Sequence, residues 1–518
     1  TMRTTATTTL MAAAVLCLAL PLLPGATAKA ARPRQGDYLA RLRGSPRQSS
    51  WPAESASLAV AATDRAARHA KSPPVGRKED DRVDKLPGQP SGVDFEQYAG
   101  YVTVDAAAGR ALFYYLAEAV GGGSAAKPLL LWLNAGPGCS SLGYGAMEEL
   151  GPFRVKSDGK TLYRNPYAWN NAANVLFLES PAGVGFSYSN TTADYGRFGD
   201  NKTAEDALQF LLNWMDKFPE YKGRDFYLAG ESYAGHYVPQ LAHAILRHAA
   251  GKPSSSPINL KGIKIGNAVI NDWTDSKGMY DFFWTHALIS DATADAIGRY
   301  CNFSAAAADS DECDEATSDA GEALEDIDIY NIYAPNCQSA DLVSPPITPQ
   351  MDNFDPCSDY YVNAYLNDPD VQKALHANVT RLDHPWSACF SDVLRRWTDS
   401  AATVLPILTE LLKNDVRVWV CSGDTDGRVP VTSSRYSVNQ LQLPVAAKWR
   451  AWFSSFQGAG EVGGYVVQYK GKEKGSLSLV TVRGAGHEVP SYQPKRALVL
   501  VQGFLAGKTL PDCKTCES

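Results

Sequence analysis

The stretch DFYLAGESYAGHYVP, residues 225–239, joins an apolar run to a serine and then to a helical pattern. The aromatic and aliphatic residues of 225–230 predict a buried strand, and the apolar spacing after Ser232 predicts a helix. Gly230, Ser232 and Ala234 form a G-x-S-x-A string at the turn between them. Such a strand, sharp turn and helix present a serine hydroxyl above a sheet, so Ser232 is predicted to be a nucleophile.

Similar apolar runs recur along the chain, with amphipathic helical patterns between several of them. Helical spacing is clear at 201–221, between two of the predicted strands. Apolar strands that alternate with such helices are typical of an α/β fold with a mostly parallel sheet covered on both faces. The predicted strands are residues 101–104, 111–119, 128–134, 174–180, 225–230, 262–267, 416–423 and 478–484.

Two other strand ends carry residues that complete a catalytic set. The strand before GDTDGRVP leads to Asp424 and Asp426, and the strand before GAGHEVP leads to His487. The order serine, acid, histidine, each at the carboxyl end of a strand, is that of the α/β-hydrolases. In that arrangement His487 accepts the Ser232 proton, and a buried carboxylate orients the imidazole and stabilises its cation. We expect this carboxylate to be Asp426, because it lies three residues past the glycine that ends the strand, and Asp424 to brace the loop.

Two backbone N–H groups are needed to stabilise the charge that develops on the substrate oxygen. We expect Tyr233, directly after the nucleophile, to supply one. The glycine-rich turn NAGPGCSS, residues 134–141, is expected to supply the other from Gly136. This turn lacks the lysine of a nucleotide-binding phosphate loop. The chemistry requires no metal or cofactor, and the scattered His and Cys residues do not have the spacing of zinc ligands.

The first 84 residues differ in composition from the rest of the chain. Residues 1–28 contain one arginine, an apolar run over 10–23 and three small residues, which predict a secretory signal rather than a membrane anchor. Residues 29–84 are rich in Ala, Arg, Ser and Pro and predict a removable pro-segment or flexible arm, with a structured helix at 53–70 as the alternative. No later stretch is long and apolar enough to span a bilayer, so no membrane partner is expected after signal removal.

Charge is distributed unevenly along the chain. The first 84 residues carry 13 Lys and Arg against 7 Asp and Glu, and the remainder carries 36 against 49. The acidic remainder argues against a nucleic-acid partner and suits an acidic compartment. In the secretory route, loss of Cys17 with the signal leaves nine cysteines, an odd number that implies a free thiol. The sequons that this route makes available for glycosylation begin at Asn190, Asn201, Asn302 and Asn378.

The rhythm of strands and helices is interrupted once. Residues 272–401 contain five of the nine remaining cysteines and acidic low-complexity tracts such as SAAAADSDECDEATSDAGEALEDIDIY. We therefore expect a helical cap inserted between two parts of one hydrolase core, residues 85–271 and 402–510, with a short tail at 511–518.

Five blocks in order, WLNAGPGCSS, ESPAGVGFSYSN, GESYAGHYVP, GDTDGRVP and GAGHEVP, resemble the serine carboxypeptidases, especially the plant two-chain type also called carboxypeptidase D. The resemblance extends from Asp94 to Phe504. It implies an α/β-hydrolase fold and the release of single residues from peptide or protein C-termini at acidic pH, outside the cell or in the vacuole. A homodimer is common in this subgroup. The sequence does not decide which side chains are preferred on either side of the scissile bond.

In the family that the chain resembles, three side chains bind the free carboxylate of the substrate. They correspond here to Asn134, Glu149 and Glu231. Two carboxyls that share a partly buried site cannot both ionise, so in the protonated form they donate hydrogen bonds to the substrate carboxylate. A glycine usually follows the asparagine in the family, but Ala135 stands there in this chain. Its main-chain N–H is implied in the same site, and a methyl group would tilt it if the backbone required a positive φ.

The resemblance also implies a cleaved linker and three disulfides. In two-chain members a linker within the insertion is excised, and the Pro-rich stretch at 339–353 is the expected site here. Cys421 is expected to be a buried free thiol, and the pairing of Cys513 and Cys516 stays open. The implied disulfides are Cys139 with Cys389, Cys301 with Cys313, and Cys337 with Cys357.

Two other functions stay open on the sequence. Plant relatives with the same triad transfer acyl groups from glucose esters to alcohols, but they tend to alter the asparagine of the carboxylate site, which is retained here as Asn134. A secreted binding or signalling module without activity would not need Ser232, Asp426 and His487 together. The sequence therefore favours a carboxypeptidase, with an acyltransferase as the alternative.

Overall fold

The structure, a computed structural model, describes residues 76–250, 256–304, 310–347, 354–382, 384–455, 460–471 and 473–512. The predicted signal at 1–28 lies outside these ranges, as do most of the predicted arm at 29–84 and the cysteines at 513 and 516. The excision predicted at 339–353 falls partly outside them, because residues 348–353 are not described.

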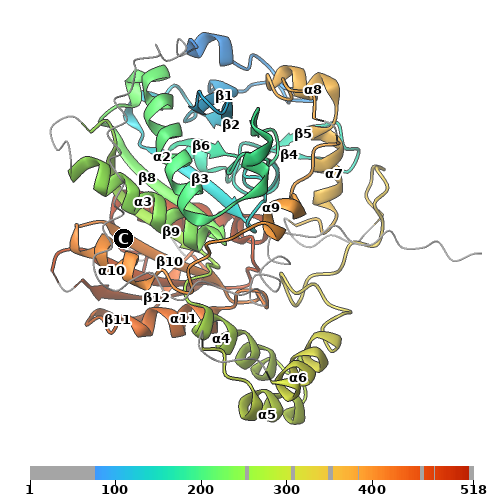
Figure 1. The fold of residues 1–518 in the computed structure, drawn as a ribbon, viewed down its shortest axis with the longest axis vertical. Coiled ribbons are helices and arrows are strands. Elements are labelled where there is room, and N and C mark those ends of the chain that lie inside the picture. The colour runs from blue at the N-terminus through green and yellow to red at the C-terminus, as the bar shows by residue number, and fades with distance from the viewer. Residues whose placement is uncertain are drawn as a thin grey trace, which may run out of the picture. The chain divides into compact units, whose positions relative to one another are not determined.

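An 11-stranded sheet runs through the middle of the described chain, in the order β1-β2-β6-β3-β8-β9-β10-β13-β12-β11, with β7 paired to β2 (Figure 1). The six central strands are parallel to one another, and they are β6 (Asn174–Leu178), β3 (Leu129–Ala135), β8 (Asp225–Ser232), β9 (Asn259–Gly266), β10 (Arg417–Gly423) and β13 (Ser476–Val482). The antiparallel strands are β1 (Gln97–Asp105), β2 (Arg110–Ala117), β7 (Tyr188–Ser189), β12 (Val462–Lys470) and β11 (Val445–Phe453). The predicted α/β-hydrolase class, with its mostly parallel sheet, is confirmed.

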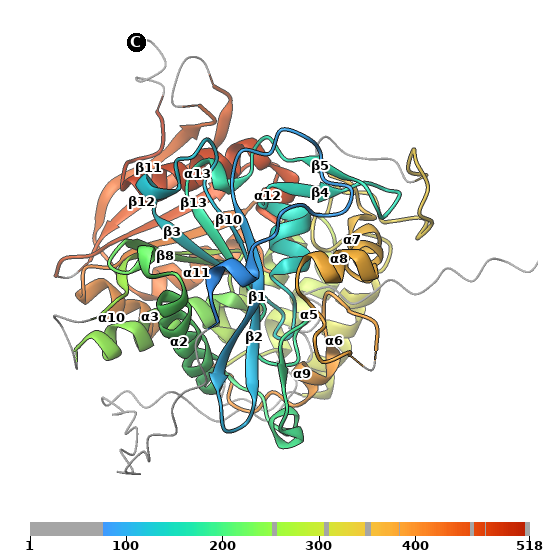
Figure 2. The ribbon, with the colours of Figure 1, turned by 90° about the horizontal axis from the view of Figure 1, so that it is seen from above.

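Alternate residues of the central strands enter two separate cores, because side chains along a strand point to opposite faces. On β3, Leu131 and Leu133 join the core that contains buried residues of α2 (Asp200–Lys217), α3 (Ala234–Ala250) and α10 (Leu405–Lys413). Leu130 and Trp132 join the other core, which contains residues of α12 (Val489–Tyr492) and α13 (Pro494–Ala506). Figure 2 shows α2, α3 and α10 on one side of the sheet and α13 on the other. Both faces are thus covered, as the apolar strands predict.

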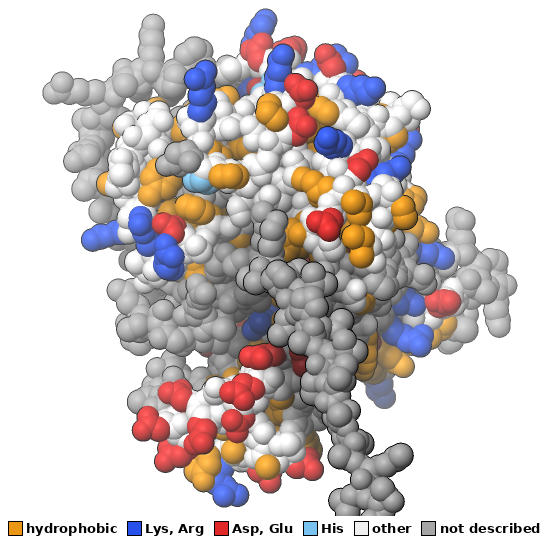
Figure 3. Space-filling view, turned by 90° about the vertical axis from the view of Figure 1, so that its right-hand side faces the viewer, with side chains coloured by type: hydrophobic (Ala, Val, Ile, Leu, Met, Phe, Trp, Pro, Cys, Tyr) orange, Lys and Arg blue, Asp and Glu red, His pale blue; other side chains and the backbone are white. Residues whose placement is uncertain are grey.

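The insertion predicted at 272–401 consists of two parts that pack differently. Helices α4 (Asp272–Thr285), α5 (Asp291–Tyr300) and α6 (Asp311–Glu322) surround a small core of their own that includes Phe282 and Ile297. Acidic side chains gather over α5 and α6 (Figure 3). Helices α7 (Ser358–Leu366), α8 (Pro369–Ala374) and α9 (Ser391–Arg395) belong to the second part, and Tyr365 of α7 enters the main core. This second part, which contains α7, α8 and α9 and is called the return half of the insertion below, is therefore part of the hydrolase core.

The last residues of the predicted arm contact the core. A short turn at Lys78–Asp81 places Asp81 where it accepts a hydrogen bond from the Tyr114 hydroxyl at 2.5 Å and pairs with Lys217. Val83 is buried, and its N–H donates to the Gln97 carbonyl at 2.9 Å. The boundary at residue 84 and removal of the segment stay predictions.

Three disulfides form between the pairs implied by the resemblance: Cys139–Cys389, Cys301–Cys313 and Cys337–Cys357. Cys139–Cys389 spans 250 residues and ties the turn after β3 to the return half of the insertion. Cys421 is a buried free thiol, and burial raises its pKa to about 11. None of the helices in the described ranges is both long and apolar enough to cross a membrane.

The four sequon asparagines all lie in described parts of the chain. Asn190, Asn201 and Asn302 are exposed, which suits an acceptor for a glycan. Asn378 is half-buried, and its side-chain amide donates to Gln372 at 2.9 Å. Glycosylation at each position stays a prediction.

Candidate active site

The predicted nucleophile lies at the turn between β8 and α3. Ser232 is fully buried and has a φ of 62°, in the left-handed region that costs a non-glycine residue strain. The turn is also crowded, because a Cβ at Gly230 would lie 2.4 Å from the Leu133 carbonyl oxygen and one at Gly235 would lie 2.2 Å from that of Val269. Small residues on either side of Ser232 thus allow the strained turn that carries the hydroxyl.

The acid and the histidine meet beyond β10 and β13, two neighbouring parallel strands. The Nδ1 atom of His487 lies 2.8 Å from Oδ2 of Asp426, and both side chains are fully buried. The carboxylate also accepts hydrogen bonds from the backbone N–H groups of Arg428 at 2.7 Å and Val429 at 3.2 Å. These donors fix the position of the carboxylate, which is what an acid that orients an imidazole requires.

Asp424 occupies a different place from Asp426. Its Oδ1 accepts a hydrogen bond from the Gly484 N–H at 2.7 Å, which joins the loop after β10 to the turn after β13. Burial raises the pKa of Asp424. The structure therefore places Asp426 on the histidine and Asp424 in the bracing position that the sequence predicts.

Ser232 Oγ and His487 Nε2, the atoms predicted to react, are not hydrogen-bonded to each other or to another described residue. Both atoms are buried. Asp426 holds the imidazole, and the Tyr330 ring packs edge-on against it at 5.2 Å between centroids. The backbone N–H of His487 donates to the Tyr330 carbonyl at 2.7 Å. The hydrogen bond between serine and histidine in such sites often tightens only with substrate bound.

Asn267 is a residue of the site that the sequence analysis missed. It follows β9, and its Nδ2 donates to Asp426 Oδ2 at 2.8 Å while its Oδ1 accepts from the Gly423 N–H at 3.0 Å. Its own N–H donates to the Cys421 carbonyl at 2.9 Å. Its position just past a central strand was the one available signal, and its φ of 39° marks it as a constrained residue.

The predicted oxyanion donors lie at the ends of adjacent strands, since Ala135 of β3 pairs with Ser232 of β8 and Gly136 follows directly. The Tyr233 N–H donates to the Ala135 carbonyl at 3.0 Å. An oxyanion at this donor must share that hydrogen bond or replace it. The roles of Gly136 and Tyr233 stay predictions.

The three side chains implied in carboxylate binding are in direct contact. Nδ2 of Asn134 donates to Glu149 Oε1 at 2.8 Å and to Glu231 Oε1 at 3.2 Å. The amide is oriented from its other end, because its Oδ1 accepts from Trp132 Nε1 at 2.5 Å and from the Gly145 N–H at 3.0 Å. Asn134 therefore presents its two N–H groups to a pair of buried carboxyls.

Glu149 lies at the end of a π-helix, Leu142–Glu149, and is almost completely buried. Burial raises its pKa to about 8, helped by the nearby charge of Glu488, while the hydrogen bonds to Asn134 and Glu231 and the charge of Arg154 act in the opposite direction. Its Oε2 atom is buried and forms no hydrogen bond with a described residue. At acidic and neutral pH this carboxyl is a proton donor.

Two buried charged residues beside the carboxyls were not identified from the sequence. Glu488 follows His487 directly, and Arg154 of β4 (Phe153–Val155) donates from Nη2 to the carbonyls of Glu149 and Pro490, both at 2.9 Å. Arg154 thereby joins the end of the π-helix to the loop after the histidine. Glu488 lies within the block GAGHEVP, but only the fold reveals that it and Arg154 lie beside Glu149.

A cavity of about 410 Å³ lies next to this cluster. Glu148, the buried neighbour of Glu149, lines it, and the Glu148 carbonyl accepts from Ser491 Oγ at 2.9 Å. The other lining residues are Met147, Arg154, Val155, Lys156, Ser157, Tyr163, Ser344, Pro345, Pro346, Phe354, Asp355, Ser358, Val362 and Ser491. Part of the predicted linker thus forms a wall of this cavity.

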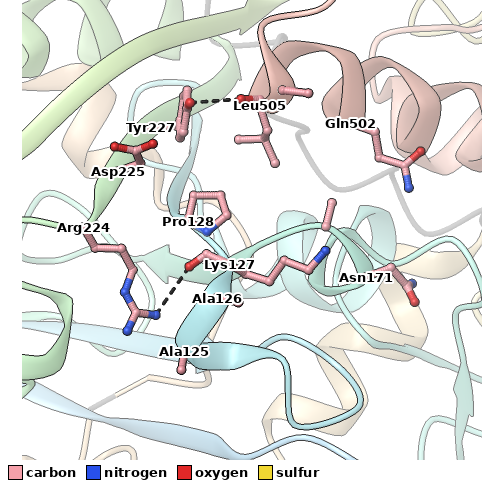
Figure 4. A pocket seen from close by; sticks show the side chains of 12 residues that line it. Ala125, Ala126, Lys127, Pro128, Asn171, Arg224, Asp225, Tyr227, Gln502 and Leu505 are labelled. Carbon is pink, nitrogen blue, oxygen red and sulfur yellow. Dashed lines mark hydrogen bonds between the residues drawn. The ribbon is translucent and has the colours of Figure 1, made fainter.

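A second cavity of about 410 Å³ lies at the opposite edge of the sheet, where β3 and β8 begin (Figure 4). There Tyr227 donates to the Leu505 carbonyl at 3.0 Å, and Arg224 donates to the Lys127 carbonyl at 3.4 Å. No residue of the predicted site lines it. Across the described ranges, no group of three or more His, Cys, Asp or Glu residues is placed to hold a metal ion.

Replacing Ala135 by glycine should leave catalysis almost unchanged. Ala135 ends β3 and is not among the described non-glycine residues with positive φ, so its methyl group imposes no backbone strain. We expect kcat/KM within about twofold of wild type and a free energy of unfolding lower by about 0.5–1 kcal/mol, since glycine loses more conformational freedom on folding. Steady-state kinetics and thermal unfolding measure both. A tenfold gain in peptide affinity would show that the methyl group does disturb the site.

Stability should fall as pH rises from about 4.5 to 8. Burial raises the pKa of Glu149 from 4.5 to about 8, so the folded protein holds a proton that the unfolded chain releases over this interval. The stabilisation is present below the unfolded pKa and is lost as pH passes through the folded pKa. Calorimetry of wild type and Glu149→Gln across this range should show a smaller decline for the variant. Parallel curves would refute the assignment.

Comparisons with known proteins agree with this geometry. A family model described as serine carboxypeptidase matches residues 87–507. Serine carboxypeptidase-like 40 from Arabidopsis thaliana is 56% identical over 440 residues, which cover 84% of each chain. Serine carboxypeptidase 24 from the same plant is 50% identical over 448 residues, which cover 84% of this chain and 94% of that protein. The crystal structure of Kex1(delta)p, a prohormone-processing carboxypeptidase from Saccharomyces cerevisiae, aligns with a TM-score of 0.68 at 25% identity over 83% of this chain and 96% of that one.

Proposed function

Because this chain belongs to the serine carboxypeptidase family, we propose that it releases single residues from the C-termini of peptides by acyl-enzyme chemistry at acidic pH. One observation carries the proposal beyond family membership. Asn134 lies on β3 and Glu231 on β8 directly before Ser232, and Glu149, at the end of the π-helix, completes the buried group. A site that binds a terminal carboxylate beside the nucleophile selects the last peptide bond of a chain.

The reaction follows from the placement of the three catalytic groups. Ser232 Oγ attacks the scissile carbonyl carbon as its proton passes to His487 Nε2, and Asp426 stabilises the resulting imidazolium. The imidazolium then protonates the leaving amine, the C–N bond breaks, and the terminal amino acid departs. Water, activated by the same histidine, attacks the ester to Ser232 and releases the shortened peptide. The oxyanion of each tetrahedral intermediate is assigned to the N–H groups of Gly136 and Tyr233.

Recognition of the terminal carboxylate by a protonated carboxyl is compatible with activity at acidic pH. With its pKa raised to about 8 by burial, Glu149 stays protonated under acidic conditions and donates to a carboxylate instead of repelling it. Asn134 adds an N–H donor to the same place. An amide or ester at the C-terminus carries no charge and gains less from these donors.

The test compares two substrates of opposite chemistry. Purified protein is incubated at pH 5 with an N-blocked dipeptide and, separately, with a sinapoyl-glucose ester and an acceptor alcohol. The proposal predicts release of the free C-terminal amino acid and no ester product. Transfer of the sinapoyl group at a higher kcat/KM than dipeptide hydrolysis would instead assign the acyltransferase reaction, for which Ala135 in place of glycine is the one feature in favour.

The cellular setting belongs to the same proposal. The signal predicted at 1–28, the sequons and the three disulfides support an oxidising secretory route, and an acidic destination outside the cell or in the vacuole suits the protonated carboxyl. Gels of the native protein with and without reductant test excision within 339–353. Two bands only after reduction support a two-chain enzyme, and one band of full mature size under both conditions refutes it.

A further inference from the structure

A fully buried carboxylate at the start of α2 connects elements that the catalytic mechanism does not otherwise link. Asp200 is 1% exposed, and its two oxygens contact side chains from α3 and from the return half of the insertion. Oδ1 accepts from the Tyr233 hydroxyl at 2.9 Å and from Trp397 Nε1 at 3.1 Å. Oδ2 accepts from Gln240 Nε2 at 2.7 Å and lies 3.0 Å from His236 Nδ1.

The contact with Tyr233 connects this carboxylate to the nucleophile. Tyr233 follows Ser232, and its N–H donates to the Ala135 carbonyl at 3.0 Å while its hydroxyl lies 2.9 Å from Asp200 Oδ1 and 2.6 Å from Ser400 Oγ. The ring is packed face to face against His236 at 4.6 Å and edge-on against Trp397 at 5.9 Å. One residue is therefore held at its backbone by the strand that carries the oxyanion turn and at its phenol by Asp200.

The pKa of Asp200 is lowered, so its carboxylate can act as an acceptor at acidic pH. Burial by itself acts to raise the pKa of this carboxyl, but the charge and hydrogen bond of His236, with the hydrogen bonds from Gln240 and Tyr233, hold it below its ordinary value. The neighbouring acid Asp399 caps α2 by accepting from the N–H groups of Asp200 and Asn201. Asp200 thus stays an acceptor under conditions in which Glu149 is protonated.

We propose that Asp200 is a positioning residue for the reaction: through the Tyr233 phenol it fixes the turn that aims the Ser232 hydroxyl and the Tyr233 N–H. The inference rests on Ser232 being the nucleophile of the proposed function. A side chain that only stabilises the fold would affect the amount of active protein. A positioning residue affects the rate at which each folded molecule reacts, because small displacements of reacting groups are costly to catalysis.

The experiment compares Tyr233→Phe, which removes only the phenol oxygen, with Gln240→Leu, which removes another donor to the same carboxylate seven residues further along the chain, in α3. Labelled sites are counted with a fluorophosphonate, and kcat, KM and the second-order labelling rate are expressed per labelled site. We expect Tyr233→Phe to lower kcat and the labelling rate by about 10- to 100-fold with KM within about twofold. Gln240→Leu should lower the thermal midpoint but keep both rates within about twofold.

Asp200→Asn provides the second arm, with a loss of rate at least as large as that of Tyr233→Phe. If this variant does not fold, the comparison of Tyr233→Phe with Gln240→Leu still decides the matter. Wild-type rates per labelled site in Tyr233→Phe, or equal losses in both variants, would overturn the proposal. Absence of labelling in the wild-type protein would instead overturn the proposed function, so the two failures are distinguishable.

Discussion

Replacing Asp426 by asparagine should lower kcat by about 10⁴-fold, whereas replacing Asp424 by asparagine should keep kcat within about tenfold of wild type. Asp426 Oδ2 lies 2.8 Å from His487 Nδ1, and asparagine at this position would favour the wrong tautomer of the imidazole and no longer stabilise its cation. The Asp424 carboxylate instead accepts a hydrogen bond from the Gly484 N–H, in the turn after β13, at 2.7 Å. The two substitutions are chemically identical and two residues apart, so each controls for the other.

The measurement is kcat for an N-blocked dipeptide at pH 5, with active sites titrated by fluorophosphonate and folding checked by thermal unfolding. Loss of activity by Asp426→Asn should occur with a folded protein, because asparagine keeps the shape of the side chain and can keep its oxygen at the Oδ1 position, where the Arg428 N–H donates. Equal losses in the two variants would show that the loop, not one carboxylate, is what catalysis requires. A larger loss in Asp424→Asn would reverse the assignment.

The KM for peptides should rise steeply as pH is raised through about 8, while the KM for the matching C-terminal amides should stay flat. Burial raises the pKa of Glu149 to about 8, so above this pH the carboxyl ionises and repels the substrate carboxylate instead of donating to it. The loss approaches tenfold in KM per pH unit, since each unit removes nine-tenths of the protonated enzyme. At pH 9, one unit above this pKa, KM should be about tenfold higher than at pH 5.

Glu149→Gln is the matched variant for this prediction. An amide donates at every pH, so the variant should bind peptides with a KM that no longer depends on pH above 7. Initial rates from pH 5 to 9, with free-acid and amide forms of one peptide, give the four curves required. A KM for the free acid that is constant over this range in the wild-type protein would contradict the role of Glu149, and so would a retained pH dependence in the variant.

The residues of the predicted catalytic set could be selected from the sequence because each lies in a recognisable local pattern. Ser232 lies in a strand–turn–helix pattern, and Asp426 and His487 follow strongly apolar strands, so the parallel sheet brings three strand ends to one edge. The choice of Asp426 over Asp424 rested on spacing from Gly423, and the structure places Asp426 on the imidazole. Local pattern and topology were sufficient for these positions.

Residues that act through tertiary contacts could not be predicted in this way. Asn267 and Asp200 occupy no motif, and each depends on a distant partner, Tyr233 at 33 residues from Asp200 and Asp426 at 159 residues from Asn267. The carboxyl cluster of Asn134, Glu149 and Glu231 was reached through the family resemblance alone. The physical reason is that burial and mutual charge, which set its chemistry, are properties of the folded site.

The errors in organisation have a similar origin. The edge pair β11 and β12 was missed because β11 is mostly exposed and carries little of the apolar signal of a central strand. The arm boundary at 84 was placed by composition and stays a prediction, and composition gave no sign that Asp81 and Val83 are buried by contacts with distant strands and α2. Residues 272–401 were predicted to be one inserted cap because the acidic first half dominates the composition of this stretch. Its second half packs on the main core.

Selection of a free C-terminal carboxylate by a serine nucleophile is tested most directly by one time course at pH 5. An N-blocked peptide and its C-terminal amide are incubated with the protein, and the released residue is followed by mass spectrometry before and after Ser232 is labelled with a fluorophosphonate. We expect one residue to leave the free acid at least tenfold faster than the amide, with both reactions abolished by the label. Equal rates for the two peptides, or release that survives labelling of Ser232, would contradict this account.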